Sequence, residues 1–173
     1  MATISLSSAI HSLAPYVSMV ESQTATPYNT IYNENCHRIY SLAFWMTDNE
    51  LTAEQLSANT FLRAFAGVNE PTTECIDRAF LAEVRELVPV GPLTLHCSIS
   101  PNIQNVHGNI KRIHLERAVV ELPATEKMIF LMHDVEGYEH ERVAHLLGIS
   151  EEESKLGLHQ ARVQIRELVA KMS

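Results

Sequence analysis

Several polar side chains near the carboxyl end of the chain have the types and spacing that suit nucleic-acid recognition. Four of them recur at intervals of four, three and four residues, which places them on one flank of a helix: Lys155, His159, Arg162 and Arg166. Lys and Arg bind phosphate oxygens, while the amides of Gln160 and Gln164 can reach adenine edges. The candidate DNA-contacting residues are Ser154, Lys155, His159, Gln160, Arg162, Gln164 and Arg166.

Such a helix needs a second helix and a tight turn to present it to a duplex. Residues 139–147 and 151–172 are predicted helices, and the residues between them are Gly148, Ile149 and Ser150. Glycine readily adopts the left-handed backbone conformation that often ends a helix, so Gly148 is expected to end the first one. Ser150 and Glu153 have the spacing of a capping box at the start of the second helix. The pattern predicts a helix-turn-helix, which favours DNA binding over the simpler interpretation that the basic residues form a solvated flank.

Within the second helix, we expect Leu158, Ala161, Ile165 and Leu168 to face inward. The outermost face is then predicted to hold Leu156, Gln160, Val163 and Gln164. Residues 151–153 are all Glu, at the end of the helix that would approach a polyanion. Acids in the first turn are favoured by the helix dipole, so they do not argue against DNA binding.

The overall composition excludes several classes of protein. The 173 residues carry a net charge of −8, so no global basic field attracts nucleic acid, but residues 154–173 have four Lys or Arg against one acid. Three cysteines without a CxxC pair predict reduced thiols. The sequence shows neither a signal peptide nor a membrane span, so we expect a cytoplasmic protein without membrane insertion.

Neither catalysis nor a bound cofactor is indicated by the sequence. It lacks a Gly-rich phosphate loop, GxSxG and HExxH, so we expect no enzyme and no cofactor. His133, His140 and His145 are spaced by seven and five residues, which does not place two of them on one helical face. We therefore expect no metal site there.

Hydrophobic periodicity predicts helices almost throughout and an all-α protein. The expected helices span about residues 5–20, 33–46, 52–66, 73–88, 111–121, 124–135, 139–147 and 151–172. Thr52 and Gln55 form a predicted capping box at the start of the third helix. Residues 91–110 are rich in Pro, Gly, Ser and Asn and read as a linker between a helical domain at 1–90 and a helix-turn-helix domain at 111–173.

Two stretches of the chain resemble one known family. The C-terminal stretch "LPATEKMIFLMHDVEGYEHERVAHLLGISEEESKLGLHQARVQIREL" resembles the promoter-binding domain of extracytoplasmic-function RNA polymerase sigma factors. The stretch "RIYSLAFWMTDNELTAEQLSANTFLRAFAG" is similar to the polymerase-binding domain of the same family. The resemblance implies core RNA polymerase, promoter DNA and an anti-sigma factor as partners. It also implies polymerase contacts by Ala53, Glu54, Gln55, Leu56, Asn59 and Arg63.

The resemblance breaks down at a few positions. The family usually has Asp where this chain has Gln55 and Gln where it has Ala58. The segment that melts and reads the downstream promoter element is here "TTECIDRAFLAEVRELVPV", in which acids outnumber basic residues and Phe80 is the one aromatic residue. Family members also tend to be basic at the positions of Gly157 and Gln160.

Two other interpretations stay open at this point. A sigma-like adaptor or decoy would bind polymerase or an anti-sigma factor with little DNA contact, which the acidic character of residues 73–88 motivates. A LuxR-like transcription factor would share the C-terminal helix-turn-helix. It would also need a sensing N-terminal domain, often α/β, and residues 1–90 show no strand pattern that supports one.

Overall fold

A computed structural model describes residues 26–94 and 112–172 of the chain. These residues form helices joined by short turns, without a strand, so the predicted all-α class is confirmed. The helix expected at residues 5–20, most of the linker and Cys97 lie outside the described residues. None of the described helices is both long enough and apolar enough to span a bilayer.

Three helices make up the N-terminal part: α3 (Pro27–Thr47), α4 (Glu50–Phe65) and α5 (Thr73–Leu87). The helix expected at residues 33–46 begins earlier, at Pro27, because Thr26 caps it and the fixed φ of proline suits the first helical turn. The predicted capping box of Thr52 is wrong, because α4 begins two residues earlier than expected. The side chain of Asn49 caps α4 instead, accepting a hydrogen bond of 2.9 Å from the Thr52 amide.

The core of these three helices comes from apolar residues at helical spacing. Ile39, Ile76, Phe80, Leu81 and Val84 are almost wholly buried. The burial of Phe80 follows from its place on the inner face of α5. Its ring fills the core in this structure and is not presented for base stacking.

The C-terminal part contains α6 (Arg112–Val120), α7 (Ala124–Phe130), the π-helix η1 (Leu131–Val135), α8 (His140–Leu147) and α9 (Glu151–Met172). The helix expected at 124–135 is thus α-helical in its first part and changes to π winding in its second. Gly137, at φ 73°, reverses the chain after η1. Helix α9 packs against α6, α7 and α8 and organises this half.

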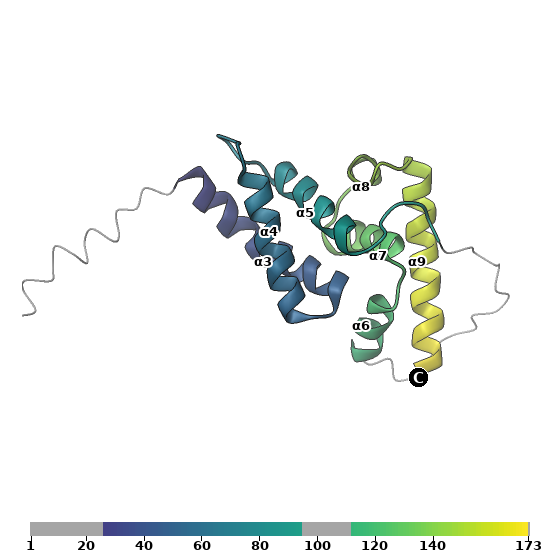
Figure 1. Cartoon of the computed structure of the whole chain (residues 1–173). Coiled ribbons are helices and arrows are strands. Elements are labelled where there is room, and N and C mark those ends of the chain that lie inside the picture. The colour runs from purple at the N-terminus through teal and green to yellow at the C-terminus, as the bar shows by residue number, and fades with distance from the viewer. Residues whose placement is uncertain (1–25, 95–111, 173) are drawn as a thin grey trace, which may run out of the picture.

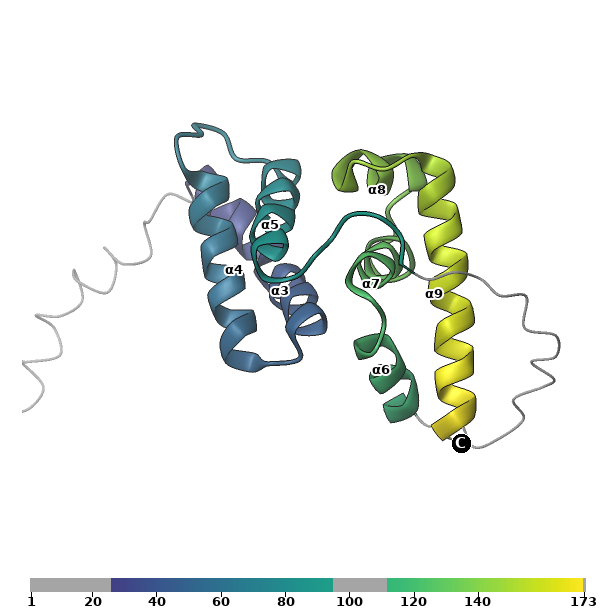
Figure 2. The same cartoon turned by 45° about the vertical axis from the view of Figure 1, so that its right-hand side comes forward.

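The two groups of helices lie side by side. Figures 1 and 2 show α3, α4 and α5 on one side and α6 to α9 on the other, with α9 at the outer edge of the second group. Residues 88–94 cross from the end of α5 to the second group, which Figure 2 shows clearly. Helix α5 packs against α8, and α3 packs against α6 and α7.

Candidate nucleic-acid interface

The helix-turn-helix is built from α8, a three-residue turn and α9. Gly148 adopts a left-handed conformation at φ 71°, which ends α8 and starts the turn. Ser150 and Glu153 form the expected capping box: the Glu153 amide donates to Ser150 Oγ at 3.1 Å, and the Ser150 amide donates to Glu153 Oε2 at 2.8 Å. These contacts explain how α9 can begin with three consecutive acids.

The predicted basic stripe lies on the exposed part of α9. Gln164 is half-buried and lies about two and a half turns after Lys155, on the opposite side of α9. Lys155, His159, Arg162 and Arg166 are all exposed. They share one flank because α9 runs unbroken from Glu151 to Met172. The geometry therefore presents these side chains on a single helical surface, as phosphate contact requires.

Two of these cations are already paired within the chain. Arg162 donates to both carboxylate oxygens of Asp134 on η1, at 2.9 and 2.7 Å. This pairing lowers the pKa of Asp134 below its ordinary value, chiefly through the hydrogen bond from Arg162. Lys155 pairs with Glu151 one turn earlier at 2.6 Å. Among the described residues, Arg166 has no ion pair, so it is the cation least restrained by the protein.

Two predicted DNA contacts are not exposed in this structure. Gln160 is only 6% exposed, so its expected place on the outermost face is wrong. Its Oε1 is buried without a hydrogen-bond partner among the described residues. Ser154 is fully buried, and its Oγ lies 3.0 Å from His140 Nδ1. Leu156, in contrast, is 47% exposed, in agreement with its expected place on the outermost face of the helix.

The place of Gly157 explains why a small residue is found where the family tends to be basic. A Cβ at this position would lie 2.5 Å from Ile129 Cδ1 and 2.7 Å from Leu93 Cδ2. Leu93 belongs to the segment that joins the two groups of helices. Gly157 therefore lets α9 approach α7 closely and leaves space for that segment to lie on the helix.

The structure brings together two histidines that the sequence spacing separates. The rings of His133 and His140 stack with centroids 4.2 Å apart, because the turn at Gly137 folds α8 back toward η1. Burial, then the neighbouring His133 and Lys155, lower the pKa of His140. Within residues 26–94 and 112–172, no three His, Cys, Asp or Glu side chains are grouped so as to hold a metal ion.

The residues expected to contact polymerase divide between two faces of α4. Ala53 and Leu56 are buried in the core, whereas Glu54, Gln55 and Asn59 are exposed. Arg63 is also exposed, but its guanidinium pairs with Glu83 and Glu86 of α5, each at 2.5 Å. Of the six residues expected to contact polymerase, Glu54, Gln55 and Asn59 are therefore the ones that are exposed without an ion pair among the described residues.

An apolar groove runs along the exposed side of α4. It lies between α3 and α4, has a volume of about 650 Å³, and is lined by residues that include Tyr32, Tyr40, Ala58 and Leu62. Leu62 is the most exposed large apolar side chain of α4, at 71%. Exposed apolar surface beside polar residues is typical of a protein-binding face. The sequence pattern of α4, apolar on two sides, was the signal for this face.

Comparisons with known proteins agree with this architecture. A family model described as "Sigma-70, region 4" matches residues 112–165. The extracytoplasmic-function RNA polymerase sigma factor SigE of Mycolicibacterium smegmatis is 26% identical over 168 residues, which cover 87% of this chain. The chain spans 65% of the length of that relative.

A solved structure shares the fold. The sigma factor RpoE from Bartonella quintana, in complex with the anti-sigma factor NepR, is 15% identical and superposes with a TM-score of 0.58. The match covers 82% of this chain and 96% of that one. Together, the three comparisons show that the chain is similar to sigma factors in its region 4 sequence and in its fold.

Proposed function

We propose that this protein is a sigma factor that directs core RNA polymerase to promoters, with α3 to α5 binding polymerase and α8 and α9 binding promoter DNA. The observation that carries the proposal is the helix-turn-helix of α8 and α9, whose second helix displays the exposed stripe. The protein acts by binding, in the cytoplasm, where its polymerase partner is found.

The DNA contacts that we propose are the exposed ones: Lys155, His159, Arg162 and Arg166. Gln164 is half-buried on the opposite side of α9, so we do not include it. In a docked helix-turn-helix the second helix enters the major groove and the first crosses the backbone. Few cations take part, so the free protein binds DNA weakly and with a shallow salt dependence. Contacts from polymerase supply the remaining affinity.

The polymerase contact that we propose is the groove between α3 and α4 together with the exposed polar residues of α4. Glu54 lines that groove, and Gln55 and Asn59 are exposed on the same helix. Ala53 and Leu56 support this surface from beneath and do not touch a partner.

The first test is capture of core RNA polymerase by the immobilised full chain. We expect binding that is lost in Leu62→Glu, which places a charge in the groove. Leu51→Glu is the matched control, because Leu51 is similarly exposed on α4 but does not line the groove. Failure of the unaltered chain to capture polymerase would contradict the proposal.

The second test is promoter-specific transcription with purified core enzyme. Replacing Arg162 and Arg166 together by Ala should reduce transcript yield by roughly tenfold or more, because two phosphate contacts are lost. Arg112→Ala is the control, since Arg112 is an exposed Arg with an i,i+4 partner outside α9. Unchanged yield in the double variant would show that the stripe is structural.

A sigma-like adaptor or decoy is a second candidate function, because one observation favours it. Phe80 is buried, and α5 carries Glu74, Asp77, Glu83 and Glu86, which together give little means of holding an unpaired DNA strand. Polymerase capture without promoter-specific transcripts would support this candidate. The LuxR-like interpretation needs a sensing N-terminal domain, often α/β, and residues 26–94 are helical without a strand.

We also propose an anti-sigma protein as a partner. The solved relative RpoE is in complex with the anti-sigma factor NepR. The groove beside α4 and the exposed apolar residues of this chain offer surface for such a protein. Purification of the full chain from its host with a co-purifying protein that blocks polymerase capture would support this partner.

A further inference from the structure

One carboxylate, that of Asp77, joins the two groups of helices. Asp77 lies on α5 and is 2% exposed. Its Oδ1 lies 2.8 Å from Arg38 Nη1 of α3. Its Oδ2 accepts hydrogen bonds from Arg142 Nη2 of α8 at 2.7 Å and from the Tyr138 hydroxyl at 2.8 Å. Charged hydrogen bonds from both halves of the molecule therefore converge on a single buried acid.

The groups around Asp77 also contact one another. Arg38 Nη1 donates to the Tyr138 hydroxyl at 2.8 Å, and the guanidinium of Arg142 lies over the Tyr138 ring at 3.9 Å from its centroid. Asn35 Oδ1 accepts from Arg38 Nε and Nη2 and fixes its orientation. Burial and the nearby Asp77 raise the pKa of Tyr138 to about 12, so the hydroxyl keeps its proton and donates it. The network is closed and internally satisfied.

Further contacts extend the interface along α5 and the connecting segment. Arg85 donates to the carbonyl of Leu147 at 2.9 Å, beside the turn of the helix-turn-helix. In the connecting segment, the Gly91 amide donates to Thr125 Oγ1 at 3.0 Å and the Thr94 amide donates to Glu126 Oε1 at 2.5 Å. Leu93, between them, lies on Gly157 of α9.

These contacts are incompatible with a docked helix-turn-helix. The first helix of such a motif has to cross the DNA backbone, but here α8 packs against α5. Helix α5 is acidic, so a phosphate backbone at α8 would meet steric overlap and like charge. The place of Leu93 on Gly157 and the burial of Gln160 likewise keep part of α9 away from a duplex.

We propose that Asp77, Arg38, Tyr138 and Arg142 form an intramolecular lock that holds the free protein closed and unable to dock DNA. The lock regulates the DNA-binding surface described above, so it rests on the proposed function. It also explains two departures from the family pattern: the acid at Asp77 and the absence of a side chain at Gly157 both serve closure. Opening separates α8 from α5 and frees both DNA-docking helices.

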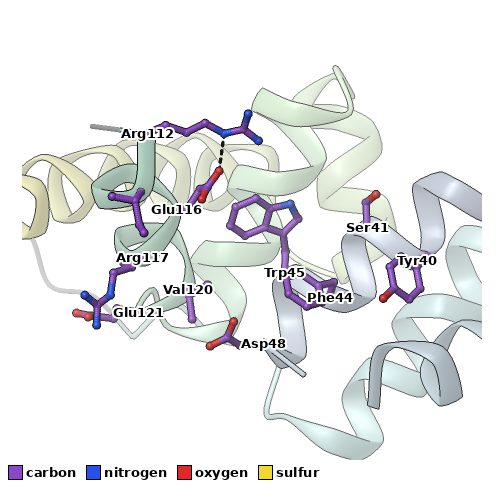
Figure 3. A pocket seen from close by; sticks show the side chains of 11 residues that line it. Tyr40, Ser41, Phe44, Trp45, Asp48, Arg112, Glu116, Arg117, Val120 and Glu121 are labelled. Carbon is purple, nitrogen blue, oxygen red and sulfur yellow. Dashed lines mark hydrogen bonds and ion pairs between the residues drawn. The ribbon is translucent and has the colours of Figure 1, made fainter. Parts of the chain in front are cut away.

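The interface is well packed only on the side of the lock. On its other side, α3 and α6 border a cavity of about 760 Å³ whose lining includes Tyr40, Phe44, Trp45, Arg117 and Val120. Figure 3 shows the side chains of the two helices on opposite sides of this space, with Trp45 between them. A partly open interface that depends on one polar centre is suited to reversible separation. Trp45 is the single tryptophan of the chain and therefore reports on that separation.

The test uses the full chain with two substitutions that leave both cores untouched. Arg142→Gln removes a half-exposed partner of Asp77, and Tyr138→Phe removes the bridging hydroxyl without changing charge. Glu86→Gln is the matched control, because Glu86 lies on the same helix α5 and pairs with Arg63 within the N-terminal group. Opening is measured by acrylamide quenching of Trp45 and by small-angle X-ray scattering of the free protein.

DNA docking is measured separately, by fluorescence anisotropy with a labelled mixed-sequence duplex of about 30 base pairs in about 50 mM salt. We expect both lock variants to increase Trp45 quenching and the radius of gyration, while the control matches the unaltered protein. Tyr138→Phe should raise DNA affinity on the order of tenfold, because loss of a charged hydrogen bond shifts the closed-to-open equilibrium by that factor.

Two outcomes would overturn the lock: unchanged quenching and scattering in both variants, or opening without any gain in DNA affinity for Tyr138→Phe. Neither measurement needs polymerase. Failure of the proposed function gives a different result from failure of the lock. If the proposed function is wrong, the unaltered chain and all variants fail to capture core polymerase, although the lock variants still open as expected. Polymerase capture together with an unresponsive Trp45 would reject the lock alone.

Discussion

Two acidic stretches of this molecule, residues 151–153 and helix α5, have different physical roles. Residues 151–153, at the start of α9, are exposed, and Glu153 completes the cap with Ser150. On α5, Asp77 is buried and accepts hydrogen bonds from two other helices and a turn. Near the proposed DNA-binding surface, Glu153 thus stabilises the start of its own helix, whereas Asp77 holds distant helices together. From the sequence, an acid that caps its own helix can be identified by the capping pattern. An acid that joins distant helices has no such local pattern.

The sharpest way to break this comparison is to remove the buried acid. Asp77→Ala should lower the free energy of unfolding by about 3 kcal/mol, the lower end for a broken buried pair, because Arg142 is half exposed. Urea unfolding followed by circular dichroism measures the change. Glu74→Ala, which removes an exposed acid of α5, should change it little. Equal effects of the two substitutions would contradict the distinction.

A second experiment puts a basic residue where the family tends to have one. Gly157→Arg should cost about 1–3 kcal/mol of unfolding free energy, because the new side chain overlaps Ile129 and Leu93. It should also displace the connecting segment, so the Thr94 amide exchanges faster with solvent deuterium. Leu156→Arg is the control on the exposed face of the same helix. Unchanged exchange at Thr94 would show that Leu93 does not depend on Gly157.

A third experiment weakens the exposed acidic stretch through its cap. Ser150→Ala should lower the free energy of unfolding by about 1 kcal/mol, because the Glu153 amide loses its acceptor. Ser41→Ala removes a serine from the middle of α3 and should have a smaller effect. A thermal melt monitored at 222 nm compares them. A loss as large as that of Asp77→Ala would remove the contrast between the two stretches.

The smallest expected effect is a pH dependence from His140. Its pKa is lowered in the folded protein, so below the ordinary histidine range the unfolded chain binds more protons than the folded one. Stability should therefore decline as the pH falls from about 7 to 5.5, by an amount that shrinks in His140→Gln. Urea midpoints at several pH values measure it. An identical slope in His140→Gln and the unaltered protein would assign the decline to other groups.

The sequence predicts the helices well because their signals are local. Glycine at the end of α8 and the Ser150 cap lie within one turn of the boundaries that they determine. The expected start of α3 at residue 33 was wrong, because Thr26 and Pro27 begin the helix in a stretch whose composition predicts a turn. The start of α4 was misplaced because two polar residues three positions apart, Asn49 and Thr52, are both possible caps. The π winding of η1 has no comparable local sequence signal.

The candidate site was predicted only in part, because exposure depends on distant segments. The positions of Lys155 and Arg166 on an exposed flank follow from helical periodicity. The burial of Gln160, the overlap between Leu93 and Gly157, and the convergence on Asp77 depend on how the two groups of helices pack. The division into domains at 1–90 and 111–173 stays a prediction.

The length of η1 has an evolutionary consequence. Its π turn accommodates one residue more than an α-helical turn, and one residue rotates a helix by about 100°. Deleting a residue there would swing Asp134 away from Arg162 and shift the start of α8. Relatives whose sequences carry a one-residue gap at this point should therefore lack an acid that neutralises the Arg162 position. Such a gap would change the charge of the proposed DNA-binding surface without any substitution on α9.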